Sequence, residues 1–275
     1  MDDCDDRHTD GHLLLDRDMM KQNAIIRVEN LNIGYDGKVI MKNLSFDIPK
    51  GDIFIIMGGS GCGKSTLLRT LTGLIPAQAG RILIRDTDFI NACSKDKLDI
   101  MKHSGILYQS GALFSSMTLA ENVALPLQQY TSYSRDRISQ IVSFKLALVG
   151  LCGYEDYYPS EISGGMRKRA GLARALALDP EIVYFDEPSA GLDPVSSKNL
   201  DDLILEINKT LGTTIIVVTH ELASIFTIAK NSIFLDKTIR TISAKGNPRE
   251  LLKNPPNQQV YEFLTRGEPN EKGTK

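Results

Sequence analysis

A group of glycines followed by a lysine and a serine carries the clearest chemical signal in the sequence. Residues 58–65 read Gly-Gly-Ser-Gly-Cys-Gly-Lys-Ser, which matches the phosphate-binding pattern GxxxxGK[ST]. Glycines allow successive backbone N–H groups to turn inward around phosphate oxygens, and the start of the following helix adds the positive end of its dipole. Lys64 supplies a point charge to the outer phosphates, and the Ser65 hydroxyl can ligate Mg²⁺. The pattern therefore predicts a nucleotide-binding loop.

The segments on either side of this loop have the order that the motif requires. The apolar run Ile53–Met57 predicts a buried strand before it, and leucines at positions 67, 68, 71 and 74 predict a helix after it. A glycine-rich turn before an ordinary helix is the alternative, but a chance match in a chain of this length is on the order of one in a hundred. The predicted nucleotide-binding residues of the loop are Gly58, Gly59, Ser60, Gly61, Cys62, Gly63, Lys64, Ser65 and Thr66.

Two adjacent carboxylates follow a second buried strand. Ile182–Phe185 is an apolar run of strand length, and Asp186 and Glu187 come directly after it. The C-terminal end of a parallel strand borders the crevice in which such folds bind their ligands. Since successive residues point in different directions, we expect Asp186 to hold Mg²⁺ through water and Glu187 to act as a general base on the attacking water. A strand that leaves the core in a charged turn is the alternative, and the phosphate loop upstream weakens it.

The elements that must position these residues predict an α/β fold. Residues 166–235 alternate between helical patterns and buried strands, which indicates a parallel sheet and a P-loop NTPase core of RecA-like type. Short strand patterns between residues 25 and 48, around the turn-like segment Gly34–Gly37, and at residues 81–90 predict an antiparallel β subdomain. Residues 112–165 predict an α-helical subdomain, in which Thr118 and Glu121 fit a capping box at a helix start.

Composition and charge exclude several classes of protein. The 275 residues are 42% hydrophobic and 24% charged, so the chain can bury a core, and its net charge of −2 offers no basic field to a nucleic acid. The four cysteines lack the spacing of a zinc site or a disulfide framework, which fits a reducing compartment. Apolar runs are too short to span a bilayer and the acidic N-terminus is unlike a secretory signal, so we expect any membrane association to come through a partner.

The same patterns divide the chain into three segments. Residues 1–23 form an acidic and then mixed N-terminal extension, and residues 24–245 form one nucleotide-binding domain that contains the helical subdomain at about 112–165. Residues 246–275 form a C-terminal extension, which is rich in proline and carries a short apolar patch at Val260, Phe263 and Leu264.

The segment that begins at residue 161 resembles the signature of ABC transporter nucleotide-binding domains. Residues 161–166 read Glu-Ile-Ser-Gly-Gly-Met, similar to the family's LSGGQ motif, and a helical pattern continues to residue 176. Ser163, Gly164 and Gly165 lie at the predicted helix N-terminus, which suits a terminal phosphate. In this family the signature belongs to the opposite subunit, so the resemblance, over about residues 25–245, implies that two chains sandwich two ATP molecules. Met166 departs from the usual glutamine, and Ser-Gly-Gly alone would be only a flexible turn.

Other residues match single positions of the same family. Gln109 matches the glutamine that senses Mg²⁺ or water and couples to the membrane partner, and His220 matches the histidine that contacts the γ-phosphate. Tyr35 matches the aromatic residue that stacks on adenine, and residues 189–193, Ser-Ala-Gly-Leu-Asp, resemble the loop that crosses the dimer interface. Taken alone, each has a structural alternative: a surface glutamine, a structural histidine, a hairpin aromatic and an ordinary turn.

The resemblance thereby implies a set of roles. The predicted catalytic residues are Glu187, His220, Lys64 and Gln109, and the predicted ligands of Mg²⁺ are Ser65, Gln109 and Asp186. Three basic residues, Arg167, Lys168 and Arg169, follow the signature, and on a helix we interpret them as a solvated or interface face rather than an anion-binding patch.

The sequence between Gln109 and the signature resembles one subgroup of the family. Residues 107–114, 122–127 and 158–166, together with the tail at 260–264, look like the Mla/Mce-type ATPases, in which methionine replaces the signature glutamine. That subgroup energises the movement of lipid between bacterial envelope membranes, and its C-terminal extension reaches the neighbouring ATPase subunit. The alternative is a generic coupling surface, which would be apolar whatever the cargo.

The resemblance implies an ATP hydrolase that binds ATP and Mg²⁺ and works as a homodimer attached to integral membrane permease subunits. Its expected location is the cytoplasmic side of the inner membrane, and phospholipid is the expected cargo. A small cytoplasmic regulatory subunit and a periplasmic lipid-binding subunit are compatible further partners, and nucleic acid is not expected.

Three other functions stay open at this point. An ATPase of another ABC importer or exporter, for instance for amino acids, would carry the same motifs. A non-transport ABC clamp typically needs long coiled-coil insertions or two tandem cassettes, neither of which is present in the sequence. A regulatory module that only binds nucleotide should lack the base, whereas Glu187 is present.

Overall fold

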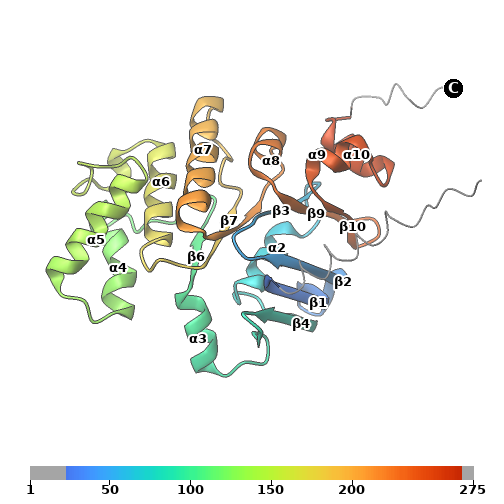
Figure 1. Ribbon diagram of the computed structural model, residues 1–275, viewed down its shortest axis with the longest axis horizontal. Helices are drawn as coiled ribbons and strands as arrows, with labels where there is room; N and C mark the ends of the chain where they lie inside the picture. Colours follow the sequence, from blue (N-terminus) through green and yellow to red (C-terminus); the bar gives the residue numbers. More distant parts are fainter. Residues whose placement is uncertain (1–22, 268–275) are drawn as a thin grey trace, which may run out of the picture.

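The computed structural model describes residues 23–267, and these form two β-sheets with helices packed around them (Figure 1). The larger sheet has the strand order β10-β9-β3-β8-β7-β6. Its strands are β3 (Ile53–Gly58), β6 (Ser104–Leu107), β7 (Ile182–Asp186), β8 (Thr214–Val218), β9 (Asn231–Asp236) and β10 (Thr241–Gly246). Strands β6, β7, β8, β3 and β9 are parallel, and β10 pairs antiparallel with β9. The prediction of a parallel sheet is confirmed.

The central strands of this sheet are buried on both faces. Every residue of β3, β7 and β8 is buried. Along β3, Ile53, Ile55 and Met57 pack into one apolar cluster, whereas Phe54 and Ile56 pack into another. Successive side chains of a strand point to opposite faces, so each face of the sheet has its own core. Because β3 and β7 are buried on both faces, their C-terminal ends have fixed positions. The phosphate loop begins at the end of β3, and Asp186 ends β7.

The smaller sheet is the predicted antiparallel subdomain. It has the order β2-β1-β4-β5, with β1 (Ala24–Tyr35), β2 (Lys38–Pro49), β4 (Ala79–Ile84) and β5 (Thr87–Asp88). A two-residue turn, Asp36-Gly37, joins β1 to β2 with φ angles of 48° and 77°, the geometry that matches the twist of a hairpin. The sequence patterns near residues 38–40 and 44–48 predict two short strands, whereas the structure has the single strand β2. The strand continues through residues 41–43 because register shifts, with Asn43 at a φ of 53°, accommodate the polar residues between the two patterns.

The helical subdomain contains α4 (Leu119–Tyr130) and α5 (Arg135–Leu148), followed by a short 3-10 turn at Pro159–Glu161 and by α6 (Gly164–Ala175). The capping box at the start of α4 is confirmed: the Thr118 hydroxyl accepts from the Glu121 backbone N–H at 3.2 Å. The Glu121 carboxylate accepts from the Thr118 backbone N–H at 2.8 Å. In Figure 1 these helices lie at one end of the molecule, on the far side of α7 (Pro194–Leu211) from the antiparallel sheet.

The remaining helices are α2 (Lys64–Leu71), α3 (Ser94–Lys102), α8 (Leu222–Ile228), α9 (Pro248–Lys253) and α10 (Gln258–Leu264). The helix predicted after the phosphate loop is α2, whereas the sequence patterns did not predict α3. The prediction that the helix after the phosphate loop carries Leu74 is wrong, because α2 ends at Leu71 and Leu74 is 51% exposed beyond Gly73, whose φ is 74°. Helix α3 has one buried residue, Ile100, so its apolar periodicity is too weak to reveal it. Between residues 23 and 267, no helix combines the length and apolar character that crossing a bilayer requires.

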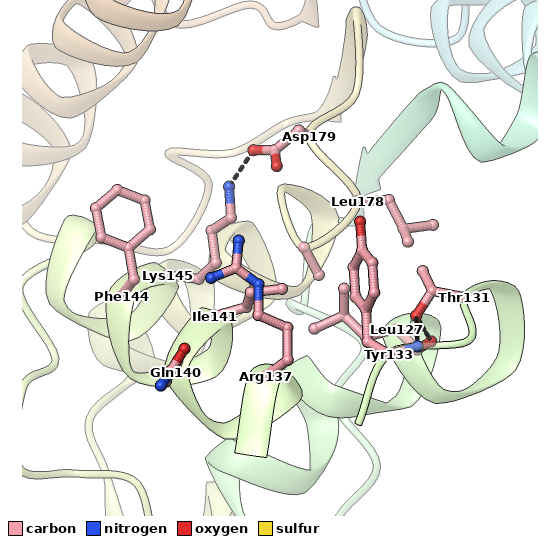
Figure 2. A pocket seen from close by; sticks show the side chains of 11 residues that line it. Leu127, Thr131, Tyr133, Arg137, Gln140, Ile141, Phe144, Lys145, Leu178 and Asp179 are labelled. Carbon is pink, nitrogen blue, oxygen red and sulfur yellow. Dashed lines mark hydrogen bonds and ion pairs between the residues drawn. The ribbon is translucent and has the colours of Figure 1, made fainter. Parts of the chain in front are cut away.

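A cavity of about 470 Å³ lies in the helical subdomain, between α4, α5 and the loop after α6 (Figure 2). Lys145 of α5 lines it with only 2% of its side chain exposed, and its ammonium group donates to the Asp179 carboxylate at 2.5 Å. A buried ammonium needs such a partner, because an unpaired charge out of water is costly. The pair therefore ties α5 to the loop that leads from α6 into β7.

Asp201 of α7 makes the stability of the fold depend on pH. Its side chain is buried, and burial raises its pKa to about 6 from 3.8, with Asp202 and Glu221 adding to the rise. The Ser224 hydroxyl donates to one carboxylate oxygen at 2.8 Å, while the other oxygen has no hydrogen-bond partner among the described residues. Because the folded-state pKa is the higher one, the folded state holds the proton between pH 3.8 and 6, and stability is lost as the pH rises through 6.

Replacement of Asp201 by Asn should therefore stabilise the protein at neutral and alkaline pH. The amide keeps an acceptor for Ser224 and removes the buried charge, so we expect the Tm at pH 8 to rise by about 2–4 °C. The gain should shrink as the pH falls from 6 to 4, since Asp201 of the wild type then becomes protonated in the folded state and no longer carries a buried charge. Thermal unfolding followed by circular dichroism across this pH range tests the expectation, with Asp156→Asn, at an exposed position, as a control. A lower Tm for Asp201→Asn at pH 8 would contradict it.

Candidate functional site

The predicted phosphate loop joins β3 to α2 and lines a cavity of about 590 Å³. The predicted loop residues 58–66 all contribute to its wall, and so do three of the site residues predicted elsewhere in the chain, Gln109, Glu187 and His220. The parallel sheet explains this meeting, because the segments after β3, β6, β7 and β8 all leave the same edge. The structure thus brings together residues that are more than 150 positions apart.

Two glycines allow the loop to adopt its path. Gly58 has a φ of 149°, and a Cβ there would lie 2.5 Å from the carbonyl oxygen of Leu235 in β9. Gly63 has a φ of 92° and directly precedes the first residue of α2. Any larger residue at these positions would be strained or would push the loop away from the sheet. The loop's backbone N–H groups and the start of α2 are therefore held together around one space.

Lys64 lies along its own loop with 8% of its surface exposed. Its ammonium group donates to the carbonyl oxygens of Gly58 at 3.0 Å and Gly59 at 3.1 Å. These two bonds hold a positive charge at the loop, and within residues 23–267 no carboxylate forms an ion pair with it. Such a charge is suited to the outer phosphates of a bound nucleotide.

Ser65, in the cavity wall, contacts the Asp186 carboxylate at the end of β7. The Ser65 hydroxyl donates to a carboxylate oxygen of Asp186 at 3.0 Å, although the two residues are 121 positions apart. Both offer oxygen ligands, which Mg²⁺ prefers, and Mg²⁺ commonly combines one or two such groups with water and substrate phosphates. Among the described residues no group of three or more His, Cys, Asp or Glu side chains could enclose a metal. The residues present therefore fit a Mg²⁺ ion that arrives with a nucleotide.

Glu187 and His220 form the second polar pair of the cavity. His220 Nδ1 lies 2.8 Å from Glu187 Oε1, so an N–H there donates to the carboxylate. The Glu187 side chain is 15% exposed and that of His220 is 63% exposed, so the histidine lies on the solvent side of the pair. Glu187 has a φ of 50°, which is unusual for a residue other than glycine, and its backbone N–H donates to the Val218 carbonyl at 2.9 Å. The two adjacent carboxylates have different partners, because Asp186 accepts from Ser65 and Glu187 accepts from His220.

Gln109 and Tyr35 lie at the borders of the site. Gln109 is exposed and contributes to the cavity wall two residues after the end of β6. Tyr35, at the end of β1, lies outside the cavity wall, with its hydroxyl 3.5 Å from the Thr66 hydroxyl and 3.5 Å from the Arg69 guanidinium of α2. Its side chain is 39% exposed, which leaves a ring surface free for an aromatic ligand beside the loop.

The signature residues do not take part in this cavity. Ser163 is exposed and caps α6, its hydroxyl accepting from the Met166 backbone N–H at 3.2 Å. Gly164 and Gly165 form the first turn of the helix and are only partly buried. The predicted ATP-binding residues thus fall on two separate surfaces of the chain, and a role for Ser163, Gly164 and Gly165 requires a second molecule.

Lys168 contradicts the prediction of a solvated basic face after the signature. It is 6% exposed, and its ammonium donates to the carbonyl oxygens of Pro188 at 2.6 Å and Ala190 at 2.5 Å, in the turn that follows Glu187. Arg167 and Arg169 are partly buried and bond to backbone carbonyls of residues 149, 150 and 162. The three consecutive basic residues look alike in the sequence. Only their angular positions around α6, which put Lys168 on the buried face, could have indicated that it differs from Arg167 and Arg169.

The C-terminal segment packs on its own chain next to the cavity. Helix α10 buries Val260 and Leu264, and Phe263 both meets Phe234 of β9 edge-on at 5.1 Å between ring centroids and lines the cavity. Arg266 pairs with Glu221, the residue after His220, at 3.2 Å. The prediction that the extension reaches a neighbouring subunit is not tested by one chain, and its last residues, 268–275, lie outside the described part, as do 1–22 of the predicted N-terminal extension.

Cys62 lies beneath the loop rather than in the cavity's mouth. It is 1% exposed, and burial raises the pKa of its thiol, with Lys64 acting in the opposite direction. A protonated and buried thiol reacts slowly, so this residue acts as a small space-filling side chain. Cys93 and Cys152 are exposed.

An apolar groove of about 450 Å³ runs between α3, β6, α4 and α6. Residues of the segment 109–127, here called the coupling stretch, line it together with residues of α3, which the prediction missed. The exposed apolar members are Leu98, Met101, Phe114 and Tyr130. Arg174 holds the stretch in place by donating to the carbonyls of Gly111 and Ala112 at 3.2 and 2.8 Å. Clustered exposed apolar side chains of this kind mark an interaction surface.

Comparison with known proteins places these features in a family. The family described as "ABC transporter" matches residues 41–190. A protein named "Probable ribonucleotide transport ATP-binding protein mkl" from Mycobacterium leprae is 42% identical over 245 residues, which cover 89% of this chain and 70% of that protein. The "Intermembrane phospholipid transport system ATP-binding protein MlaF" of Haemophilus influenzae is 39% identical over 245 residues, which cover 89% of this chain and 91% of that protein.

A solved structure matches the fold as well. The dimeric ATP-binding cassette MJ0796, in a post-hydrolysis state bound to ADP and phosphate, superposes with a TM-score of 0.73 at 26% identity. The match covers 81% of this chain and 98% of the cassette. The sandwich of β-subdomain, parallel sheet and helical subdomain is therefore shared with a protein that binds nucleotide as a dimer.

Proposed function

Because the chain belongs to the ABC transporter family and is an ATPase subunit of that family, we propose that it drives the movement of phospholipid between the membranes of a bacterial envelope. The observation that supports phospholipid as the cargo is the 39% identity to MlaF over 91% of that protein's length. The protein named for ribonucleotide transport is 42% identical, but only 70% of its length is matched. Ribonucleotide is therefore the second candidate cargo, and the lipid is favoured because nearly the whole of MlaF has a counterpart here.

We assign the hydrolytic roles from the cavity's geometry. Lys64 binds the outer phosphates, and Glu187 accepts a proton from the water whose oxygen attacks the γ-phosphorus. The bond from that phosphorus to the bridging oxygen then breaks, so ADP and phosphate leave. His220, 2.8 Å from Glu187, orients the carboxylate and contacts the γ-phosphate. Gln109 completes the wall on the side of the coupling stretch.

Mg²⁺ has its proposed place at Ser65 and Asp186, with Gln109 at the edge of the same site. The ion would neutralise charge on the phosphates when it is bound with them. Tyr35 would stack on adenine from the exposed end of the hairpin. The Mg²⁺ assignment depends on the contact between Ser65 and Asp186, and the adenine assignment depends on the contact of the Tyr35 hydroxyl with Thr66 at the end of the loop.

The second surface, at Ser163, Gly164 and Gly165, supports a homodimer in which each ATP contacts both chains. Exposed N–H groups at the start of α6 suit the γ-phosphate of an ATP held by the partner. Permease subunits are the proposed partners of the apolar groove, because that groove adjoins Gln109 through the stretch 109–114. Closing of the dimer would then move the groove and the membrane helices seated in it. The proposed location of the working protein is therefore the cytoplasmic face of the inner membrane.

Isolation with the permease tests this proposal. We would tag the full chain in its native host, solubilise the membranes in mild detergent, and reconstitute the recovered complex into phospholipid vesicles. The expected result is ATP-dependent transfer of a fluorescent phospholipid to acceptor vesicles, absent with Glu187→Gln. Transfer of a labelled ribonucleotide without lipid transfer would contradict the assignment of phospholipid as the cargo. Recovery of the chain with no integral membrane protein would overturn the transporter role.

A further inference from the structure

Lys168 has an environment that is unusual for a lysine. It lies on the buried side of α6, and only 6% of its surface is exposed. Its ammonium donates to two backbone carbonyls, those of Pro188 and Ala190, at 2.6 and 2.5 Å. Within residues 23–267 no carboxylate lies within ion-pair distance of it. The charged group of Lys168 therefore binds a backbone segment and no acidic side chain.

That segment is the turn that carries the proposed base. The Ala190 backbone N–H donates to the Glu187 carbonyl at 3.2 Å, and the Leu192 N–H donates to the Ser189 carbonyl at 3.1 Å. Lys168 spans these overlapping turns from the outside by binding the carbonyls of residues 188 and 190. A displacement of α6 would therefore act on the backbone directly after Glu187, whose φ of 50° already departs from the common range.

A buried ammonium without a carboxylate partner is a costly way to fill space. Burial lowers the pKa of Lys168, and the negative charge of Glu187 opposes that effect. An apolar side chain of similar length would avoid the desolvation cost if packing were the only requirement. The two charge-assisted bonds specify the position of the turn relative to α6 more strictly than packing contacts do.

We propose that Lys168 is a positioning residue that couples the two ATP sites of the dimer. The start of α6 serves the ATP held by the partner chain, whereas Glu187 serves the ATP held by its own chain. Lys168, five residues after Ser163, joins the two within one chain by a rigid helix and two hydrogen bonds. Engagement of one ATP by the signature thereby sets the position of the base at the other. The inference rests on the two-chain arrangement proposed above.

Lys168→Met, assayed in the complete complex with the permease, tests this coupling. The methionine keeps the length and removes the donor. We expect wild-type hydrolysis to depend on ATP concentration with a Hill coefficient above about 1, towards the limit of about 2 set by two sites, and Lys168→Met to show about 1. The rate at saturating ATP should fall about tenfold, while the Kd for ATP, measured with Glu187→Gln in the background, should stay within about twofold. Lys168→Arg, which retains charge and donors, should recover part of the cooperativity.

Lys145→Met is the matched control. Lys145 is also a buried lysine of the helical subdomain, but it pairs with Asp179 beside the other cavity (Figure 2). Neither residue lines the cavity that contains Glu187. We expect it to lower the Tm while leaving the Hill coefficient unchanged. The coupling role is overturned by a non-cooperative wild type, by an unchanged Hill coefficient in Lys168→Met, or by an equal loss in Lys145→Met. None of those results bears on the proposal that each ATP site is shared between two chains. That proposal is tested separately, by combining Lys64→Ala and Gly165→Asp in one dimer.

Discussion

Replacement of Glu187 by Gln is expected to reduce ATP turnover by at least about a hundredfold while leaving ATP binding intact. The amide keeps the size of the side chain and an oxygen that can accept from His220, 2.8 Å away, but it cannot take a proton from water. ATP that is bound and not split should hold two chains together. We would measure phosphate release at steady state and, by size-exclusion chromatography with light scattering, the mass of the variant with ATP and Mg²⁺.

Glu221→Gln is the control for this experiment. Glu221 has the same charge and lies next to His220, but it pairs with Arg266 outside the cavity wall. We expect its turnover to remain within about twofold of wild type. If Glu187→Gln hydrolysed ATP at near the wild-type rate, Glu187 would not be the base. If it remained monomeric with ATP, trapping of a closed dimer would be refuted instead.

Two inactive variants are expected to regain activity when they are combined in one dimer. Lys64→Ala removes the charge of the phosphate loop, and Gly165→Asp places a negative charge at the start of α6, where it would repel a phosphate. A Cβ at Gly165 would meet only ordinary contacts at 3.8 Å and beyond, with Ser196 and Leu192, so the fold should tolerate the change. In the mixed dimer one site carries both defects, and the other carries neither.

The expected activity of the mixed dimer is clearly above that of either homodimer and at most about half of the wild type, because one of two sites is intact. The coupling proposed for Lys168 would lower it further, since the chain that supplies the base of the intact site carries the defective signature. We would co-express the variants with different affinity tags, purify through both tags, and measure hydrolysis with the permease present. Each homodimer should be below about one hundredth of wild type. As a control, a dimer of Lys64→Ala chains carrying both tags should stay inactive. Failure of the mixed dimer to exceed both homodimers would refute a site shared between chains.

Much of the site could be predicted because its parts are short contiguous motifs. The phosphate loop is defined by spacing alone, and the end of a buried strand predicts the place of Asp186. Their meeting, 121 residues apart at Ser65 and Asp186, follows from the rule that parallel strands share one C-terminal edge. The contact of Lys168 with the turn after Glu187 could not be predicted in this way, because it depends on how α6 packs and on which of three adjacent basic residues faces inward.

The fold followed the sequence where periodicity was strong. The buried strands β3, β7 and β8 and the capped helix α4 have clear patterns, and each is present. Helix α3 and strand β6 were missed, since α3 buries a single residue and β6 is four residues long. The apolar patch of the C-terminal segment proved to be the buried face of α10, where Val260 and Leu264 are four positions apart. A short helix of seven residues gives too little pattern to be identified alone.

The contrast between the buried Cys62 and the exposed Cys93 and Cys152 gives the chain natural attachment points for fluorescent dyes. Maleimide reagents attack accessible thiols, so in a chain whose Cys4 has been replaced they would label residues 93 and 152 and spare the phosphate loop. Residue 93 directly precedes α3 beside the apolar groove, and residue 152 follows α5 in the helical subdomain. Energy transfer between dyes on two chains would then record opening and closing in real time, without a cysteine being introduced by mutation.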